Sequence, residues 1–172
     1  QPDAVMGGPL PFTRFASKQS GAYSEVESME HLKKVLDMKL IEYNENFAMM
    51  DLVLFEQALE HVCRIARIVQ NPSGNAMLIG VGGSGKQSLS RLAAYISGME
   101  VKQLQVTSNF KVEDLKEELG LMFKQAGVKG IPTMFIMTDS QFVDDRFLIY
   151  INALLATGWI SDLFPKDELD GL

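Results

Sequence analysis

Apolar side chains recur three or four positions apart in five stretches of the chain, and most charged side chains of each stretch lie on the opposite side. This spacing predicts amphipathic helices over residues 29–43, 52–70, 87–97, 112–126 and 145–156. Three shorter runs, two continuously apolar and one alternating, are bounded by turn residues or glycines and favour strands; they cover residues 76–79, 101–107 and 134–137. From residue 76 onward, strands and helices therefore alternate.

This alternation is typical of an α/β fold, in which helices cover both faces of a parallel sheet, because parallel neighbours need a crossover connection. Ligands bind such sheets at the carboxyl ends of the strands. The apolar residues expected to face inward from the five helices are Leu32, Val35, Leu36, Leu40 and Ile41; Leu52, Phe55, Leu59, Val62, Ala66 and Val69; Leu89, Leu92, Ala93 and Ile96; Leu115, Leu119, Met122 and Phe123; and Phe147, Leu148, Ile151 and Leu155.

Composition narrows the class of protein. The 172 residues are 47% apolar and 22% charged, which suits a globular domain and excludes a disordered tail or a collagen-like fibre. Twenty-two acidic against 16 basic residues leave a net charge of -6, so the charge pattern predicts no nucleic-acid partner and no membrane partner. No apolar run approaches the roughly 20 residues of a membrane span. The single cysteine, Cys63, cannot form an internal disulfide and suggests a reduced, cytosolic setting.

The strongest chemical motif lies between a predicted strand and a predicted helix. It reads Gly80-Val81-Gly82-Gly83-Ser84-Gly85-Lys86-Gln87-Ser88. Glycines let the backbone curl so that its N–H groups point at a phosphate, the helix N-terminus contributes its dipole, and Lys86 can reach the β- and γ-phosphates. The motif therefore predicts a phosphate-binding P-loop, against the weaker alternative that the glycines serve only a tight turn.

One position departs from the usual P-loop. A serine or threonine normally follows the lysine and ligates Mg²⁺, whereas this chain has Gln87, with Ser88 one residue further on. The glutamine amide oxygen lies on a longer arm, and Ser88 lies about 100° further round the helix. We therefore expect weakened metal coordination.

A second acidic component is expected downstream. The strand predicted at 134–137 leads into Thr138 and Asp139, which is the expected Mg²⁺ ligand. Hydrolysing enzymes of this design place a glutamate next to activate water, but here Ser140 and Gln141 follow. Neither can accept a proton at neutral pH, although Gln141 can orient a water. Hydrolysis should therefore be weak or absent.

Other candidate residues favour ordinary structural roles. His31 and His61 lack companions at metal-ligand spacing and are interpreted as helix-surface residues. Trp159 and Phe164, which follow the last predicted helix, are expected to be packing residues at a loop rather than a stacking platform. A small P-loop phosphotransferase would need a base near the γ-phosphate and an arginine-rich lid, for which the chain offers only Arg91 and Arg146.

Three segments together resemble the fourth AAA+ module of axonemal dynein heavy chains. They are residues 80–89, residues 52–56 with His61-Val62-Cys63-Arg64, and Thr138-Asp139-Ser140-Gln141. The resemblance is strongest over residues 45–165. It implies an AAA+ P-loop NTPase-type fold truncated before the sensor strand and lid, with residues 1–46 as a lead-in arm and helix and residues 47–172 as the N-terminal part of the large subdomain. In that family the glutamine after the lysine and the missing glutamate recur in this module.

The resemblance also implies a function. The module would bind ATP or ADP with Mg²⁺, with Gly80 to Ser88 on the phosphates, Asp139 on the metal and the adenine near Val53 and Leu54, and would act in regulation or structure. Its partners would be neighbouring AAA+ modules, other dynein chains and microtubules, in the cytoskeleton of the cytoplasm and the axoneme of cilia and flagella. The acidic balance speaks against direct microtubule contact by this segment. The alternative is a structural ring spacer that binds no nucleotide.

Overall fold

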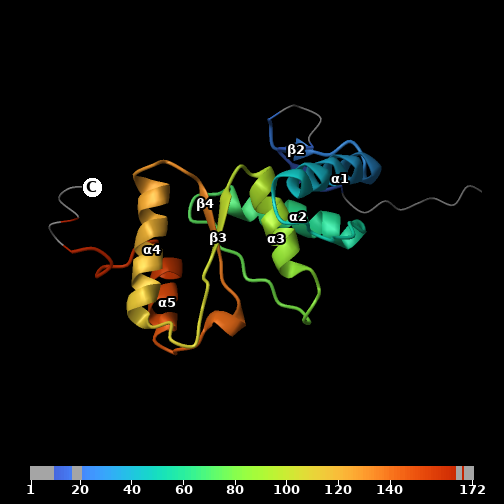
Figure 1. Ribbon diagram of the computed structural model, residues 1–172. Coiled ribbons are helices and arrows are strands. Elements are labelled where there is room, and N and C mark those ends of the chain that lie inside the picture. Colours follow the sequence, from blue (N-terminus) through green and yellow to red (C-terminus); the bar gives the residue numbers. More distant parts are fainter. Residues whose placement is uncertain (1–9, 17–20, 166–167, 169–172) are drawn as a thin grey trace, which may run out of the picture. The chain divides into compact units, whose positions relative to one another are not determined.

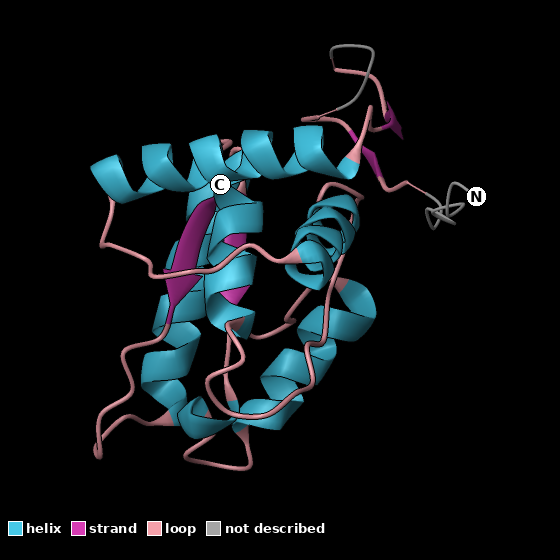
Figure 2. Cartoon of the chain, turned by 90° about the vertical axis from the view of Figure 1, so that its right-hand side faces the viewer, coloured by secondary structure: helices cyan, strands magenta, loops and turns pink. Residues whose placement is uncertain are grey.

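The computed structural model describes residues 10–16, 21–165 and 168. The chain forms two compact units, residues 1–97 and residues 98–172, whose elements are labelled in Figure 1. Among the described residues, each unit contains one pair of short strands, and helices make up most of the rest (Figure 2). The boundary between residues 97 and 98 separates two sets of residues that mostly contact one another. It is a different boundary from the one expected between the lead-in segment and the module at residue 46, which stays a prediction.

In its described residues, 10–16 and 21–97, the first unit consists of a small strand pair and three helices. Strand β1 (Phe12–Thr13) pairs antiparallel with β2 (Ser24–Glu25). The helices are α1 (Met29–Asn46), α2 (Glu56–Val69) and α3 (Lys86–Ile96). All three helices predicted for this part of the chain are confirmed, although α2 begins four residues later than expected and leaves Leu52 and Phe55 outside it.

Apolar faces of the three helices form the core of the first unit. Tyr43 of α1 packs edge-on against Tyr95 of α3, with ring centroids 5.5 Å apart. Ile41, expected to face inward, is exposed, because the buried face of α1 passes through Leu36 and Tyr43 instead. The other buried helical residues include Leu32, Leu59, Val62, Ala66, Leu89, Leu92 and Ala93, all as predicted.

The strand predicted at 76–79 is wrong. Residues 75–81 have no regular structure, and the side chains of Met77, Ile79 and Val81 are 88%, 86% and 79% exposed. A strand exists only where its backbone groups pair with a neighbour, and no ladder forms along this segment. An apolar run alone therefore indicated the wrong state, and the expected three-stranded sheet has two strands in the described chain.

The second unit contains that two-stranded parallel sheet and two longer helices. Strand β3 (Glu100–Gln103) pairs with β4 (Thr133–Ile136), with Glu100 opposite Thr133. The crossover helix α4 (Val112–Gly127) joins the strands, and a short 3-10 helix, η1 (Asp139–Gln141), and helix α5 (Phe147–Thr157) follow β4. The predicted parallel pairing is confirmed, although β3 is shorter than expected.

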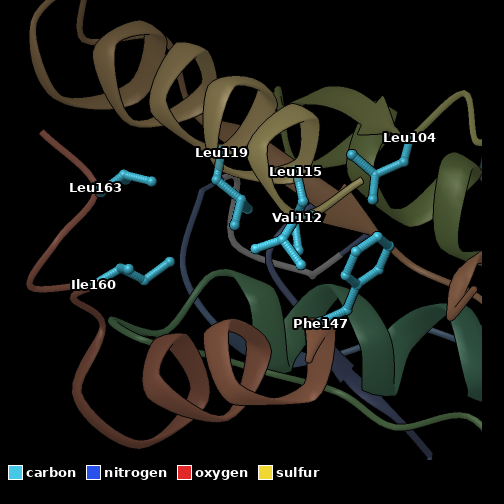
Figure 3. Close-up of a cluster of buried hydrophobic side chains, with 7 residues drawn as sticks. All are labelled: Leu104, Val112, Leu115, Leu119, Phe147, Ile160 and Leu163. Carbon is cyan, nitrogen blue, oxygen red and sulfur yellow. The ribbon is translucent and has the colours of Figure 1, made fainter. Parts of the chain in front are cut away.

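The core of the second unit lies between α4 and the chain around α5. Side chains from α4 point toward the Phe147 ring, which is fully buried and meets Phe110 edge-on at 5.9 Å (Figure 3). Leu148 and Leu155, both expected inward, are more than half exposed. Because α5 is apolar on all sides, its sequence does not identify the buried face. The cluster consists of Leu104, Val112, Leu115, Leu119, Phe147, Ile160 and Leu163.

Candidate functional site

The glycine-rich loop leads directly into helix α3. Gly83 and Gly85 have φ angles of +74° and +76°, in the left-handed region that side-chain-bearing residues rarely adopt. Gly85 is the N-cap of α3, which begins at Lys86, and Leu89 N–H closes the first helical turn on Gly85 C=O at 2.8 Å. The predicted strand before the loop is missing, but a turn with left-handed glycines is present where it was expected, and the helix begins one residue earlier than predicted.

Lys86 lies across its own loop. Its ammonium Nζ donates hydrogen bonds to the carbonyl oxygens of Gly80, at 2.8 Å, and Val81, at 2.7 Å. A third bond goes to the Ser84 hydroxyl at 3.0 Å. The cation is therefore held within the loop by three oxygen atoms that belong to the loop itself.

The lack of a side chain at Gly80 allows this close approach. A Cβ atom on Gly80 would lie 3.3 Å from Ser84 Oγ and 3.7 Å from Lys86 Nζ, which is tight contact for the first pair. At Gly82 and Gly83 an added Cβ would meet no atom within 4 Å, so the outer rim of the loop is open. Position 80 therefore favours glycine because a side chain would crowd Ser84, whereas position 83 favours glycine because its φ angle is positive.

Residues behind the loop hold its base in place. Ser90 Oγ donates to Lys86 C=O at 2.9 Å, and Ser90 and Leu89 are buried. A Cβ on Gly85 would lie 3.5 Å from Leu52 Cδ1, which places Leu52 against the start of α3. The sequence pattern placed Leu52 within a helix and indicated no contact with the loop. No local signal marks this contact, because 33 positions separate the two residues.

The residues present fit a phosphate group. An 11-residue helix points its positive end at the loop, no acidic residue occupies its first turn, and Lys86 supplies a cation there. Gln87 is exposed and Ser88 is partly buried at the following two positions. The remaining predicted contacts, Val81, Gly82 and Ser84, belong to the exposed rim. The chemistry of this loop therefore suits an anion.

Asp139 lies in the second unit, three residues beyond the end of β4. It is the first residue of η1, and its side chain is exposed. The position at the carboxyl end of a parallel strand agrees with the prediction. Among the described residues, no group of three or more His, Cys, Asp or Glu side chains is placed to hold a metal ion. The role of Asp139 as a metal ligand stays a prediction.

Gln141 is committed to a structural role. Its side chain is 7% exposed, its amide nitrogen donates to Leu104 C=O at 2.6 Å, and its amide oxygen accepts from Thr138 N–H at 2.8 Å. The idea that Gln141 orients a water is therefore wrong, because both ends of its amide are occupied inside the protein. Ser140, exposed beside it, contacts the Thr138 hydroxyl at 3.1 Å.

Other candidate residues are accounted for by local contacts. Arg146 donates from Nη2 to Asp144 Oδ2 at 2.6 Å, and this guanidinium lowers the pKa of the Asp144 carboxyl. Trp159 meets Phe123 edge-on at 6.0 Å, which confirms a packing role. Burial raises the pKa of the Cys63 thiol to about 12. His31 lies 3.8 Å from Glu27 through Nδ1 and Oε2 on the surface of α1.

Comparison with known proteins identifies the family. Residues 50–172 match the family model described as "P-loop containing dynein motor region D4". The chain is 58% identical over 147 residues to the dynein beta chain of the flagellar outer arm of Chlamydomonas reinhardtii, covering 85% of this chain and 3% of that protein. It is 53% identical over 163 residues to the corresponding alpha chain, covering 94% and 4%.

A human relative gives a similar result. Dynein axonemal heavy chain 17 of Homo sapiens is 51% identical over 150 residues, which cover 87% of this chain and 3% of the human protein. These findings define a dynein motor region of the P-loop-containing type. The chain belongs to the D4 region of the axonemal dynein heavy chain family, as its sequence indicated. It spans about 3–4% of the length of the relatives it matches.

The predicted association with cilia and flagella agrees with the printed names of these relatives, which are flagellar, ciliary or axonemal dyneins. No helix in the described part of the chain has the length and apolar character needed to cross a membrane.

Proposed function

We propose that this segment is a nucleotide-binding module of a dynein motor that holds ATP or ADP at residues 80–88 and hydrolyses ATP weakly or not at all. The supporting observation is the loop before α3, where Lys86 Nζ is fixed by Gly80 C=O, Val81 C=O and Ser84 Oγ beside a helix N-terminus. Because the turn and the helix N-terminus are already formed, a phosphate would need to displace one acceptor of Lys86 but would order little further backbone.

Weak hydrolysis follows from the residues after Asp139. Attack by water needs a base that accepts its proton, and Ser140 has no such capacity at neutral pH. Gln141 is sequestered by Leu104 C=O and Thr138 N–H and faces the interior. The module would therefore retain nucleotide rather than turn it over, which suits a regulatory or structural role.

The base of the nucleotide would lie near Val53 and Leu54. Leu52 reaches the P-loop through its contact at Gly85, and the chain then runs to a pocket of about 250 Å³ lined by Leu54 and Phe55. The other lining residues are the apolar Met29 and Leu59 and the charged Glu30, Lys33 and Glu56. An apolar slot in the same unit as the loop suits a flat aromatic base.

Mg²⁺ would accompany the nucleotide, with Asp139 as its carboxylate ligand and phosphate oxygens and water as the rest. The metal would neutralise phosphate charge, and Gln87 would offer an amide oxygen where P-loops usually have a hydroxyl. Since few protein ligands would hold the Mg²⁺ ion, nucleotide affinity should depend less on Mg²⁺ here than in a P-loop that has serine or threonine directly after its lysine.

The parent protein would be a motor that uses ATP to move along microtubules in cilia and flagella. Within it, this module would contact neighbouring AAA+ modules of the same heavy chain, while other dynein chains and microtubules would be reached through other parts of the protein. The net charge of -6 speaks against direct binding of this segment to the acidic microtubule surface.

Hydrogen exchange in the full-length protein tests nucleotide binding locally. Mass spectrometry of peptides covering residues 78–90, with and without MgATP or MgADP, should show slowed exchange in the wild type. Lys86→Ala should abolish that slowing, and the control Lys39→Ala should not, because Lys39 pairs with Glu42 on α1 at 2.7 Å and lines neither the loop nor the pocket at Leu54 and Phe55. Unchanged exchange in the wild type would overturn nucleotide binding and favour the ring spacer.

Photolabelling tests the base position and hydrolysis together. After incubation for minutes and irradiation, an 8-azido-ATP label should be attached to a peptide containing residues 52–56. The nucleotide on that peptide should still carry three phosphates. Attachment elsewhere would contradict the base position. Rapid appearance of the diphosphate on this peptide would contradict weak hydrolysis, whatever the other sites of the motor do.

A further inference from the structure

The Ser84 hydroxyl has a contact that the general P-loop pattern does not require. It accepts a hydrogen bond from Lys86 Nζ at 3.0 Å, the longest of the three bonds that hold the ammonium. The other two acceptors are backbone carbonyls, fixed in place by the chain. Ser84 is therefore the only side chain among the three acceptors, and the only one that can rotate away.

The three N–H donors of the Lys86 ammonium are all occupied, because each is directed at an oxygen atom of the loop. A phosphate oxygen can bond Lys86 directly only by displacing one of these acceptors. The hydroxyl is the easiest to displace, and it alone can then turn its own hydrogen toward the phosphate, because a hydroxyl both accepts and donates.

Gly80 supports the same assignment. The Ser84 Oγ atom lies where a Cβ on Gly80 would be only 3.3 Å away, so the hydroxyl is lodged against the Gly80 backbone. A methyl group there would require the hydroxyl to shift by a few tenths of an ångström from its place beside Lys86. The two residues thus act as a pair, with glycine at position 80 admitting the serine at position 84.

We infer that Ser84 is a positioning residue for nucleotide binding, which holds the third N–H of Lys86 until a phosphate oxygen takes its place and then donates to that phosphate. This inference rests on the proposed function. It assigns to the Ser84 side chain a role that acts through Lys86, and to Gly80 the role of keeping that side chain in reach.

The first experiment measures affinity in the full-length protein. MgADP is titrated while exchange of residues 78–90 is followed, for the wild type, Ser84→Ala and Ser84→Thr. We expect Ser84→Ala to raise the MgADP concentration for half-maximal protection roughly threefold to tenfold, the value of one ordinary net hydrogen bond, and Ser84→Thr to restore the wild-type concentration. Gly80→Ala should weaken binding at least as much. Ser161→Ala, an exposed serine of the second unit, is the matched control.

The second experiment is independent of nucleotide. Without nucleotide, Ser84→Ala should speed amide hydrogen exchange of residues 78–90 when Lys86 is present. In the Lys86→Ala background it should cause no further increase, because the hydroxyl acts through the ammonium. Equal acceleration in both backgrounds would show a merely structural serine and overturn the inference, as would wild-type affinity in Ser84→Ala. Absence of any nucleotide effect in the wild type would overturn the proposed function, and the inference with it.

Discussion

Replacement of Gln141 should loosen the second unit at two places that are far apart in sequence. The Gln141 amide joins Leu104 C=O, just after β3, to Thr138 N–H, just after β4, at 2.6 and 2.8 Å. Gln141→Met keeps most of the side-chain volume but removes both hydrogen bonds. It leaves the Leu104 carbonyl, which is buried, and the Thr138 N–H group, which is partly buried, without their Gln141 partners.

The size of the effect follows from these two bonds. A net hydrogen bond contributes about 1 kcal/mol and a buried group left unpaired costs about 1–3 kcal/mol, so we expect a loss of about 2–3 kcal/mol in local stability. Because each 1.4 kcal/mol changes an equilibrium constant tenfold, protection of the Thr138 amide should fall by about 30- to 150-fold.

Hydrogen exchange of the full-length protein measures this directly in peptides covering residues 103–106 and 137–142. Gln105→Ala is the matched control, since Gln105 is exposed and adjacent to Leu104 in the chain. If Gln141→Met retained wild-type protection while Gln141→Ala lost it, packing rather than hydrogen bonding would hold the two segments, and the reasoning would be refuted.

Three further outcomes are expected. Phe147→Ala, in the core of the second unit, should cost about 3–5 kcal/mol and raise susceptibility of residues 98–165 to pulse proteolysis in urea. Gly74→Ala should fray the end of α2 in hydrogen exchange, because the new Cβ would lie 1.8 Å from Ile68 C=O, whereas Gly127→Ala, with no atom within 4 Å, should not. Cys63 should resist iodoacetamide at pH 8 until the protein is unfolded. Its folded pKa is raised from 9.0 to about 12, so its contribution to stability should be full below pH 9 and fall as pH rises toward 12 in a urea titration.

Helices and the glycine-rich loop were predictable because their signals are local. A 3.6-residue apolar period depends on residues three and four apart, and the loop depends on glycines that tolerate a positive φ at positions 83 and 85. Lys86 at the helix start follows from the same short segment. The parallel pairing of β3 with β4 was also predictable, because a crossover helix lies between two short strand patterns.

The errors arose where burial or pairing involves distant parts of the chain. Residues 76–79 are apolar enough for a strand, yet strand formation depends on a partner and not on composition. Leu148 and Leu155 are as apolar as Phe147 on the same helix, so only the packing of α4 against α5 selects the buried face. Gln141 bonds a carbonyl 37 positions away, which no local pattern predicts.

The sequence by itself thus determined the helices, the glycine loop with its lysine, and the resemblance to the dynein family, because each depends on neighbouring residues or on short motifs. Tertiary structure alone decided that the buried Gln141 amide bonds Leu104 C=O, that Leu52 lies against Gly85, and that the Ser84 hydroxyl lies close to both Gly80 and Lys86 Nζ. These contacts depend on distances of a few ångströms between atoms, and spacing along the chain does not encode such distances.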